Sequence, residues 1–323
     1  MRMRFTAAAL AIGLITSSVA CGRMAALKAK MAARDGHALY QSGDYRRAAA
    51  KYEEAIKDEA AMQADPQLTA VYFYLGNSYD NLFKPARKGE EANDKYLQMA
   101  VDNYKKAAEK SADPKLKKLA LEYLIAAYRD KMEDPAAAEP VVQQMIQMEP
   151  NEPSNYFALA QLYENAGRYE DAEQAINRAK ELRPNDPTVL MQVGTYYNRQ
   201  GRFDDAIAAF EQRAAKEPNN PEAYQYMVPF FWEKAQKDHT LNDAQKREYI
   251  ERGLAAANKA LSIKSDYLEA VVYKGLLLRT QALVEKDRKK QEALLAEAKT
   301  LQEKALALRK KQQATAAEAK KGD

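Results

Sequence analysis

The chain has 323 residues, of which 50 are Lys or Arg and 46 are Asp or Glu, so its formal net charge is +4. This near balance argues against a protein whose main task is to bind nucleic-acid phosphates, and no segment beyond the N-terminus is apolar enough to span a bilayer. A single cysteine excludes an intramolecular disulfide and any CxxC metal or redox site.

The N-terminal segment has the layout of an export signal. Met1 to Arg4 carry two arginines, and Ala7 to Ile15 form an apolar stretch that is too short to span a membrane as a helix. Small residues follow, and then Cys21, the only cysteine of the chain. We therefore predict a signal peptide over residues 1–20.

The segment Ser18-Val19-Ala20-Cys21 resembles a bacterial lipobox, although Ser18 stands where that family usually has Leu, Val or Ile. The resemblance implies cleavage before Cys21, a lipid anchor on its sulfur, and a short tether over residues 21–28. Because Gly22 is not the aspartate that signals inner-membrane retention, it implies an outer-membrane lipoprotein facing the periplasm. Ser18-Val19-Ala20 also fits an ordinary secretory cleavage site, which leaves a soluble periplasmic or secreted protein as the alternative.

The body of the chain repeats itself. The clearest copies begin at Pro153 and Pro187, and Ala160, Gly194 and Val228 follow one another at intervals of 34 residues. The first copy carries these residues at its fixed offsets: Tyr156, Leu159, Ala160, Tyr163, Gly167, Tyr169, Ala172, Ile176, Ala179 and Pro184. The second carries Leu190, Val193, Gly194, Tyr197, Gly201, Phe203, Ala206, Phe210 and Pro218. This pattern resembles the tetratricopeptide repeat, a hairpin of two helices.

The resemblance implies an all-α solenoid, a right-handed superhelix of about seven helical hairpins over residues 29–310. Small residues let the two helices of a hairpin approach closely, and a single hairpin cannot bury its apolar face without neighbours. The frame places the repeats near residues 29, 69, 118, 153, 187, 221 and 268. Residues 311–323 contain many Lys and Ala and no aromatic residue, so we expect a charged flexible tail.

Three repeats are longer than the frame by 11–13 residues. In the second repeat, residues 83–94 contain Pro and Gly and predict a loop. In the sixth, the segment from Thr240 to Asp243 predicts an early start for a helix that runs to about Ile263, and Pro229 predicts a kink in the first helix. In the seventh, alternating charge over residues 285–302 predicts lengthened helices. Such insertions either only protrude from one edge of the array or form a docking rim.

Nothing in the sequence predicts catalysis, a metal site or a cofactor. His37 and His239 lie in different repeats, and neither has a companion at the spacing that metal ligands need. No GxGxxG or GxxxxGK[ST] motif occurs, and the glycines fall at positions of the repeat frame. We therefore expect a protein that is not an enzyme.

The resemblance also implies a partner-binding groove, because in that family defined positions of each first helix line the concave surface. Carried over position by position, these are Phe73, Asn77, Asn81, Arg129, Phe157, Gln161, Asn165, Met191, Thr195, Asn198, Arg199, Gln225, Trp232 and Arg279. Asn and Gln side chains can bond the backbone of an extended peptide, while Phe157, Met191 and Trp232 can receive its side chains. The alternative is that these residues only face the groove, with Trp232 packed on a neighbouring hairpin.

The sequence thus favours a non-enzymatic scaffold for protein–protein interaction in the bacterial cell envelope. Its expected partner is an envelope protein or peptide, with no nucleic acid, and its membrane contact is the lipid anchor. An accessory protein of peptidoglycan or polysaccharide machinery, binding glycan or a glycan-handling enzyme, is the second hypothesis. The sequence identifies neither the partner nor the oligomeric state.

Overall fold

The computed structural model describes residues 24–319, and within this range the regular structure is entirely helical. The predicted signal peptide, the acceptor Cys21 and the last four residues lie outside the described residues. The all-α prediction is therefore confirmed for the body of the chain. Among the helices described, none is both long enough and apolar enough to cross a membrane.

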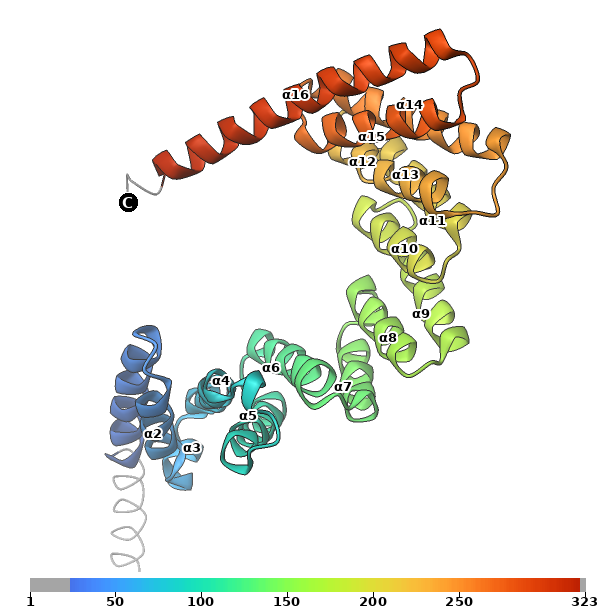
Figure 1. The fold of residues 1–323 in the computed structure, drawn as a ribbon. Coiled ribbons are helices and arrows are strands. Elements are labelled where there is room, and N and C mark those ends of the chain that lie inside the picture. The colour runs from blue at the N-terminus through green and yellow to red at the C-terminus, as the bar shows by residue number, and fades with distance from the viewer. Residues whose placement is uncertain (1–23, 320–323) are drawn as a thin grey trace, which may run out of the picture. The chain divides into compact units, whose positions relative to one another are not determined.

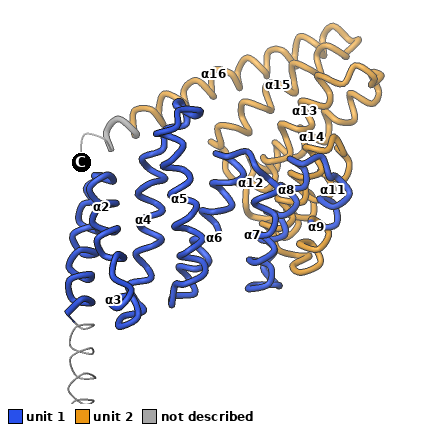
Figure 2. Tube along the Cα trace, turned by 90° about the horizontal axis from the view of Figure 1, so that it is seen from below, with its two compact units in different colours: residues 1–175 blue, residues 176–323 orange. Residues whose placement is uncertain are grey.

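The chain divides into two compact units, Met1–Ala175 and Ile176–Asp323 (Figure 2). Unit 1 contains a helix over residues 24–41 and then α2 (Tyr45–Ile56), α3 (Glu59–Ala64), η1 (Pro66–Ala70), α4 (Val71–Leu82), η2 (Pro85–Arg87), α5 (Glu91–Lys110), α6 (Pro114–Ala126), η3 (Ala127–Met132), α7 (Pro135–Met148) and α8 (Pro153–Asn165). From α4 to α8, each α-helix packs against the next one in the chain, as the colour order in Figure 1 shows.

Unit 2 begins within α9 (Tyr169–Leu182). It continues with α10 (Pro187–Arg199), α11 (Phe203–Lys216), α12 (Pro221–Gln225), α13 (Val228–Lys237), α14 (Asp243–Ile263), α15 (Leu268–Val284) and α16 (Arg288–Ala319). Antiparallel neighbours again pack in chain order, with α15 against both α14 and α16 (Figure 1). The helices α8, α10, α12 and α15 begin at the residues where the repeat frame places repeats four to seven.

Helix starts are set by a recurring cap. Asp113, Asp186 and Asn220 each precede a proline, and their side chains accept a hydrogen bond from the backbone N–H two residues on, at 2.8–3.0 Å. Proline fits the first helical position because its missing N–H would have no helical partner there. The motif Asp-Pro or Asn-Pro therefore fixes where α6, α10 and α12 begin.

In two of the hairpins, an aromatic ring of the second helix packs directly against a glycine of the first helix. A Cβ on Gly194 would lie 2.4 Å from the ring of Phe210, and one on Gly76 would lie 2.9 Å from the ring of Tyr104. Both rings are completely buried. Only glycine lets the second helix lay an aromatic ring directly on the first.

The three insertions differ from one another. The first forms a loop with the short turn η2 up to Glu90, and its last four residues are helical because α5 begins at Glu91. The second lengthens α14, which ends at Ile263 as expected and starts after a capping box of Asn242 and Gln245. The third lengthens α15 and α16 to 17 and 32 residues.

One local expectation is wrong, and one segment contains more helix than expected. The first helix of the sixth repeat is not kinked at Pro229 but interrupted, since α12 ends at Gln225 and Pro229 lies in the first turn of α13. The segment expected to be flexible from residue 311 continues as part of α16 through Ala319. An unbroken run of strong helix formers such as Lys, Gln and Ala accounts for that extension.

The glycine contact predicts opposite effects for one substitution at two equivalent positions. Gly194→Ala places a methyl group against the Phe210 ring and should lower the free energy of unfolding by about 1–3 kcal/mol. Gly275→Ala meets only ordinary contacts at 3.6 Å and should be neutral or stabilising by up to about 1 kcal/mol, because alanine favours the helix. Thermal unfolding followed by circular dichroism measures both, and equal effects of the two substitutions would contradict this account.

Candidate binding surfaces

Five of the predicted groove residues of unit 1 are exposed or half-buried, and we call this set the first-helix face: Asn81, Arg129, Phe157, Gln161 and Asn165. They come from α4, η3 and α8. Asn81, Gln161 and Asn165 are exposed, and Arg129 and Phe157 are half-buried. These side chains are therefore accessible to a partner.

Arg129 is the fixed centre of this face. Its guanidinium donates to the Asp130 carboxylate at 2.6 and 2.7 Å and to Gln161 Oε1 at 3.0 Å. Hydrogen bonding from Arg129 lowers the pKa of Asp130, and the reciprocal bond raises the pKa of Arg129. The side chain consequently keeps its charge and ties η3 to α8.

An ion pair between Asp80 and Lys131 links η3 to α4. Neither residue is among the predicted groove residues. Lys131 forms an ion pair with Asp80, whose carboxylate also accepts a bond from the Tyr104 hydroxyl at 3.4 Å. The repeat frame places Asp80 one residue before Asn81, but nothing in the sequence signals its partner 51 residues on.

Phe73 and Asn77 do not belong to the accessible surface. Phe73 is buried against the rings of Tyr74 and Tyr123. Asn77 is only 4% exposed, accepts a hydrogen bond from Tyr40 at 2.5 Å and donates to Tyr104 at 3.4 Å. Burial contradicts the prediction that a partner reaches these two side chains.

In unit 2 the predicted residues divide in the same way. Met191, Thr195 and Asn198 on α10 are half-buried, and Arg199 is exposed. Gln225 is buried, and no described group bonds its Oε1. It therefore lies out of a partner's reach.

Two further residues of unit 2 pack on neighbouring helices. The Trp232 ring stands edge-on to Tyr273 of α15 at 6.0 Å, a contact with the neighbouring hairpin. Arg279 is exposed and donates to Gln302 of α16 at 2.5 Å.

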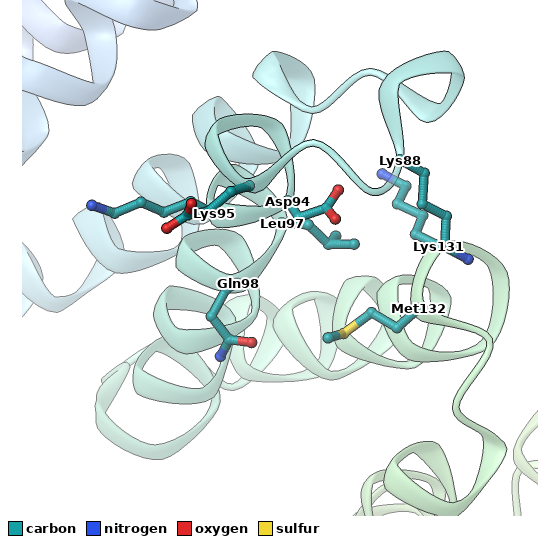
Figure 3. Close-up of a pocket in the computed structure, with 8 residues that line it drawn as sticks. Lys88, Asp94, Lys95, Leu97, Gln98, Lys131 and Met132 are labelled. Atoms are coloured by element: carbon teal, nitrogen blue, oxygen red, sulfur yellow. The ribbon is translucent and has the colours of Figure 1, made fainter.

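Pockets accompany these surfaces. Unit 1 has a pocket of about 610 Å³ between the inserted loop, the start of α5 and the end of η3 (Figure 3). In unit 2, Asn198 lines a pocket of about 310 Å³ with Phe230 and Lys237, and Arg279 lines one of about 200 Å³ between α15 and α16. The pocket of unit 1 contains none of the predicted residues, and its one sequence signal is the insertion in the second repeat.

The chemistry of residues 24–319 gives no sign of a metal centre, because no cluster of three or more potential ligands occurs among them. His37 faces inward, with its Nδ1 2.6 Å from the Tyr52 hydroxyl, and burial lowers its pKa. It is a neutral packing residue of the first hairpin.

Three family models, each described as tetratricopeptide repeat, match residues 34–108, 131–191 and 187–228. This chain is a tetratricopeptide repeat protein. The predicted resemblance is thereby confirmed for the repeats, and the helical hairpins described above are its units.

The chain is similar to several solved structures at low sequence identity. The C-terminal part of a repeat-containing protein from Cytophaga hutchinsonii is 16% identical, with a TM-score of 0.55, over 85% of this chain and 98% of that one. A tetratricopeptide repeat protein from Parabacteroides merdae is 15% identical, with a TM-score of 0.48, over 84% and 99%. YrrB, described as having an unusual peptide-binding site, is 17% identical, with a TM-score of 0.39, over 60% and 89%. No curated protein matches the chain.

The buried tyrosines of unit 1 predict a loss of stability in alkali. Burial raises the pKa of Tyr52 and of Tyr104, and for Tyr104 the nearby Asp80 carboxylate raises it further. In the unfolded chain these tyrosines ionise near pH 10, whereas in the folded protein they ionise only at higher pH. Their contribution to the free energy of unfolding is therefore complete below about pH 10 and is lost as the pH rises further.

Tyrosinate absorbance and circular dichroism, followed together, measure this. A double Tyr52→Phe/Tyr104→Phe variant should show a shallower decline of stability with pH. Titration of all 20 tyrosines near pH 10 with the helices intact would contradict the prediction.

Proposed function

We propose that this repeat protein is a non-enzymatic scaffold of the bacterial cell envelope that binds a partner protein or peptide on the first-helix face. Tetratricopeptide repeats generally serve as scaffolds for protein–protein interaction and are typically not enzymes, and no catalytic domain has been identified in the chain. The finer parts of the proposal are the surface, the lipid anchor and the envelope location.

The arrangement of Arg129 and Gln161 is the observation that carries the choice of surface. Arg129 donates a hydrogen bond to the amide oxygen of Gln161 and so holds that side chain in place. The NH₂ group of Gln161 can then donate to a backbone carbonyl of a bound peptide. Asn165 adds an exposed amide and Phe157 a half-buried ring. The NH₂ group of Asn81 donates to Asn77, so Asn81 offers a partner its amide oxygen. Amides held in place lose little entropy when they bond an extended peptide, which favours binding here.

The proposed anchor rests on the sequence around Cys21. A processed bacterial lipoprotein carries three acyl chains, and anchoring by several chains is far stronger than the marginal binding of one. Only two residues separate Cys21 from the helix over residues 24–41, so the anchor would hold the first hairpin near the membrane surface.

Lipidation has a direct test. When the full chain is expressed in bacteria with labelled palmitate, label should enter the protein, and Cys21→Ser should abolish both the labelling and the recovery in the outer-membrane fraction. Export of an unlabelled, processed chain by both forms would favour the soluble periplasmic or secreted alternative.

The binding surface has a test of its own. Crosslinking followed by capture from solubilised membranes should recover an envelope protein with the original chain, and Arg129→Ala/Gln161→Ala should lower that recovery about tenfold. Glu109→Ala/Lys115→Ala is the matched control, because these exposed residues lie outside the first-helix face.

Full recovery with the double variant would contradict this choice of surface. Failure to capture any protein, combined with co-sedimentation with purified cell wall, would favour the glycan-binding hypothesis instead.

A further inference from the structure

We infer that an exposed apolar stripe at the start of the first helix, formed by Met24, Leu27 and Met31, inserts into the surface of the membrane that holds the lipid anchor. This inference rests on the proposed lipidation of Cys21 and names the surface that the first hairpin then contacts. It is independent of the first-helix face and of any protein partner.

The three side chains of the stripe lie on one side of the helix over residues 24–41, because they are spaced by three and four residues. They are 59%, 55% and 51% exposed. The opposite side of the same turns carries the buried residues Ala26, Ala29 and Ala33. The helix therefore packs on unit 1 through alanines and leaves its large apolar side chains outside.

Stacking of repeats does not account for this stripe. Leu75 and Val193, which precede the hairpin glycines of the second and fifth repeats, are buried. The equivalent residue of the first repeat is Asp35, which is exposed and lies one turn beyond Met31 on the same side of the helix. A protein stacked along the whole helix would have to bury that carboxylate, which is costly without a partner for it. The apolar surface is thus confined to the first two turns, at the end nearest to Cys21.

The stripe lies close to the proposed anchor. The chain from Cys21 to Met24 spans at most about 11 Å, and the helix rises about 10 Å from Met24 to Met31. Acyl chains on Cys21 would therefore keep all three side chains within about 20 Å of the bilayer surface. Contact with the bilayer then becomes an intramolecular step at high effective concentration.

The form of the stripe fits a bilayer. Its side chains make a ridge on a single helix, and none of the three pockets described above includes them. An interfacial helix buries such a ridge about 5–10 Å deep at the boundary between headgroups and acyl chains. Methionine adapts its shape to fluid surroundings of this kind.

Basic side chains border the stripe. Lys28 lies on one side of it, exposed and without an ion pair to any residue of the described range 24–319. Arg34 lies on the other side and reaches Asp35 only at 3.6 Å, with both side chains at least half exposed. Long basic side chains can keep their charge among lipid phosphates while their stems lie on apolar groups. Lys30 adds nothing here, because Asp65 holds its ammonium at 2.5 Å.

Spin labelling of the full chain, as bacteria process it, tests the inference. Because Cys21 is acylated in the proposed form, an introduced cysteine is the only free thiol. Leu27→Cys places the label on the stripe, and Gln41→Cys, exposed at the far end of the same helix, is the matched control. The protein is reconstituted in vesicles of phosphatidylethanolamine and phosphatidylglycerol, and collisions of the nitroxide with oxygen and with a water-soluble nickel chelate are measured. The ratio of oxygen to nickel collisions should be about threefold higher at position 27 than at position 41.

The other outcomes separate this inference from the proposed anchor. Equal collision ratios at the two positions, in a chain that incorporates labelled palmitate, would overturn the inference and leave the anchor intact. Failure to incorporate palmitate would overturn both. Spin–spin broadening between labels at position 27 of two chains, without the excess of oxygen collisions, would assign the stripe to a second copy and also overturn the inference.

Discussion

The contact between a first-helix glycine and an aromatic ring of the second helix is the constraint on which three of the described hairpins depend. It occurs for Gly36 with Tyr52, Gly76 with Tyr104 and Gly194 with Phe210, and in each case an added Cβ would fall within 2.9 Å of the ring. At this distance the two helix axes are as close as the rings allow. This close approach helps to set which side chains of the first helix lie between the two helices.

One consequence reaches the surface that faces a partner. The residue after the glycine is His37 in the first repeat and Asn77 in the second, and the hydroxyl of the stacked tyrosine lies 2.6 Å from His37 Nδ1 and 3.4 Å from Asn77 Nδ2. The family pattern assigns this residue to the groove. Its contact with the tyrosine hydroxyl instead turns it toward the interior of the hairpin.

The fifth repeat shows what happens without that hydroxyl. There the stacked ring is Phe210, and Thr195, which follows the glycine, lies instead 3.3 Å from the hydroxyl of Tyr226 in the next repeat. The polar partner of the residue after the glycine therefore differs with the ring that the other helix carries.

This dependence explains which parts of the structure could be predicted from the sequence. The starts of α8, α10, α12 and α15 are local, because turn residues and a recurring spacing mark them. The burial of Asn77 is not local, since its amide bonds Tyr40, 37 residues earlier, and Tyr104, 27 residues further on. The same holds for Trp232, whose contact with Tyr273 requires the next hairpin. The repeat pattern therefore predicts where the helices begin, but it predicts only some of the residues that a partner can reach.

The unit 1 pocket was beyond sequence reasoning for a related reason. A proline and a glycine mark residues 83–94 as a loop, but which of its side chains line a pocket depends on the bonds of Asn93. A π-helical turn has no recognised sequence signature, so nothing indicated that η3 would supply the second wall. The insertion was visible in the sequence, and its role depended on a residue pairing that only the fold creates.

Regular and irregular segments therefore differ in how freely their side chains can serve binding. In a hairpin whose second helix packs against a glycine, a substitution on the inner face of the first helix must still fit against the neighbouring aromatic ring. Asn77, which contacts Tyr104, is an example. The inserted loop and η3 are held by Asn93 and by the backbone bond from Asp134 to Tyr128, and neither uses the side chains of Lys88 or Met132. Lys88 contacts the end of η3 only through its ion pair with the exposed Glu133 side chain. A change at Lys88 should therefore cost less stability than a change at Asn93, whose amide holds the loop.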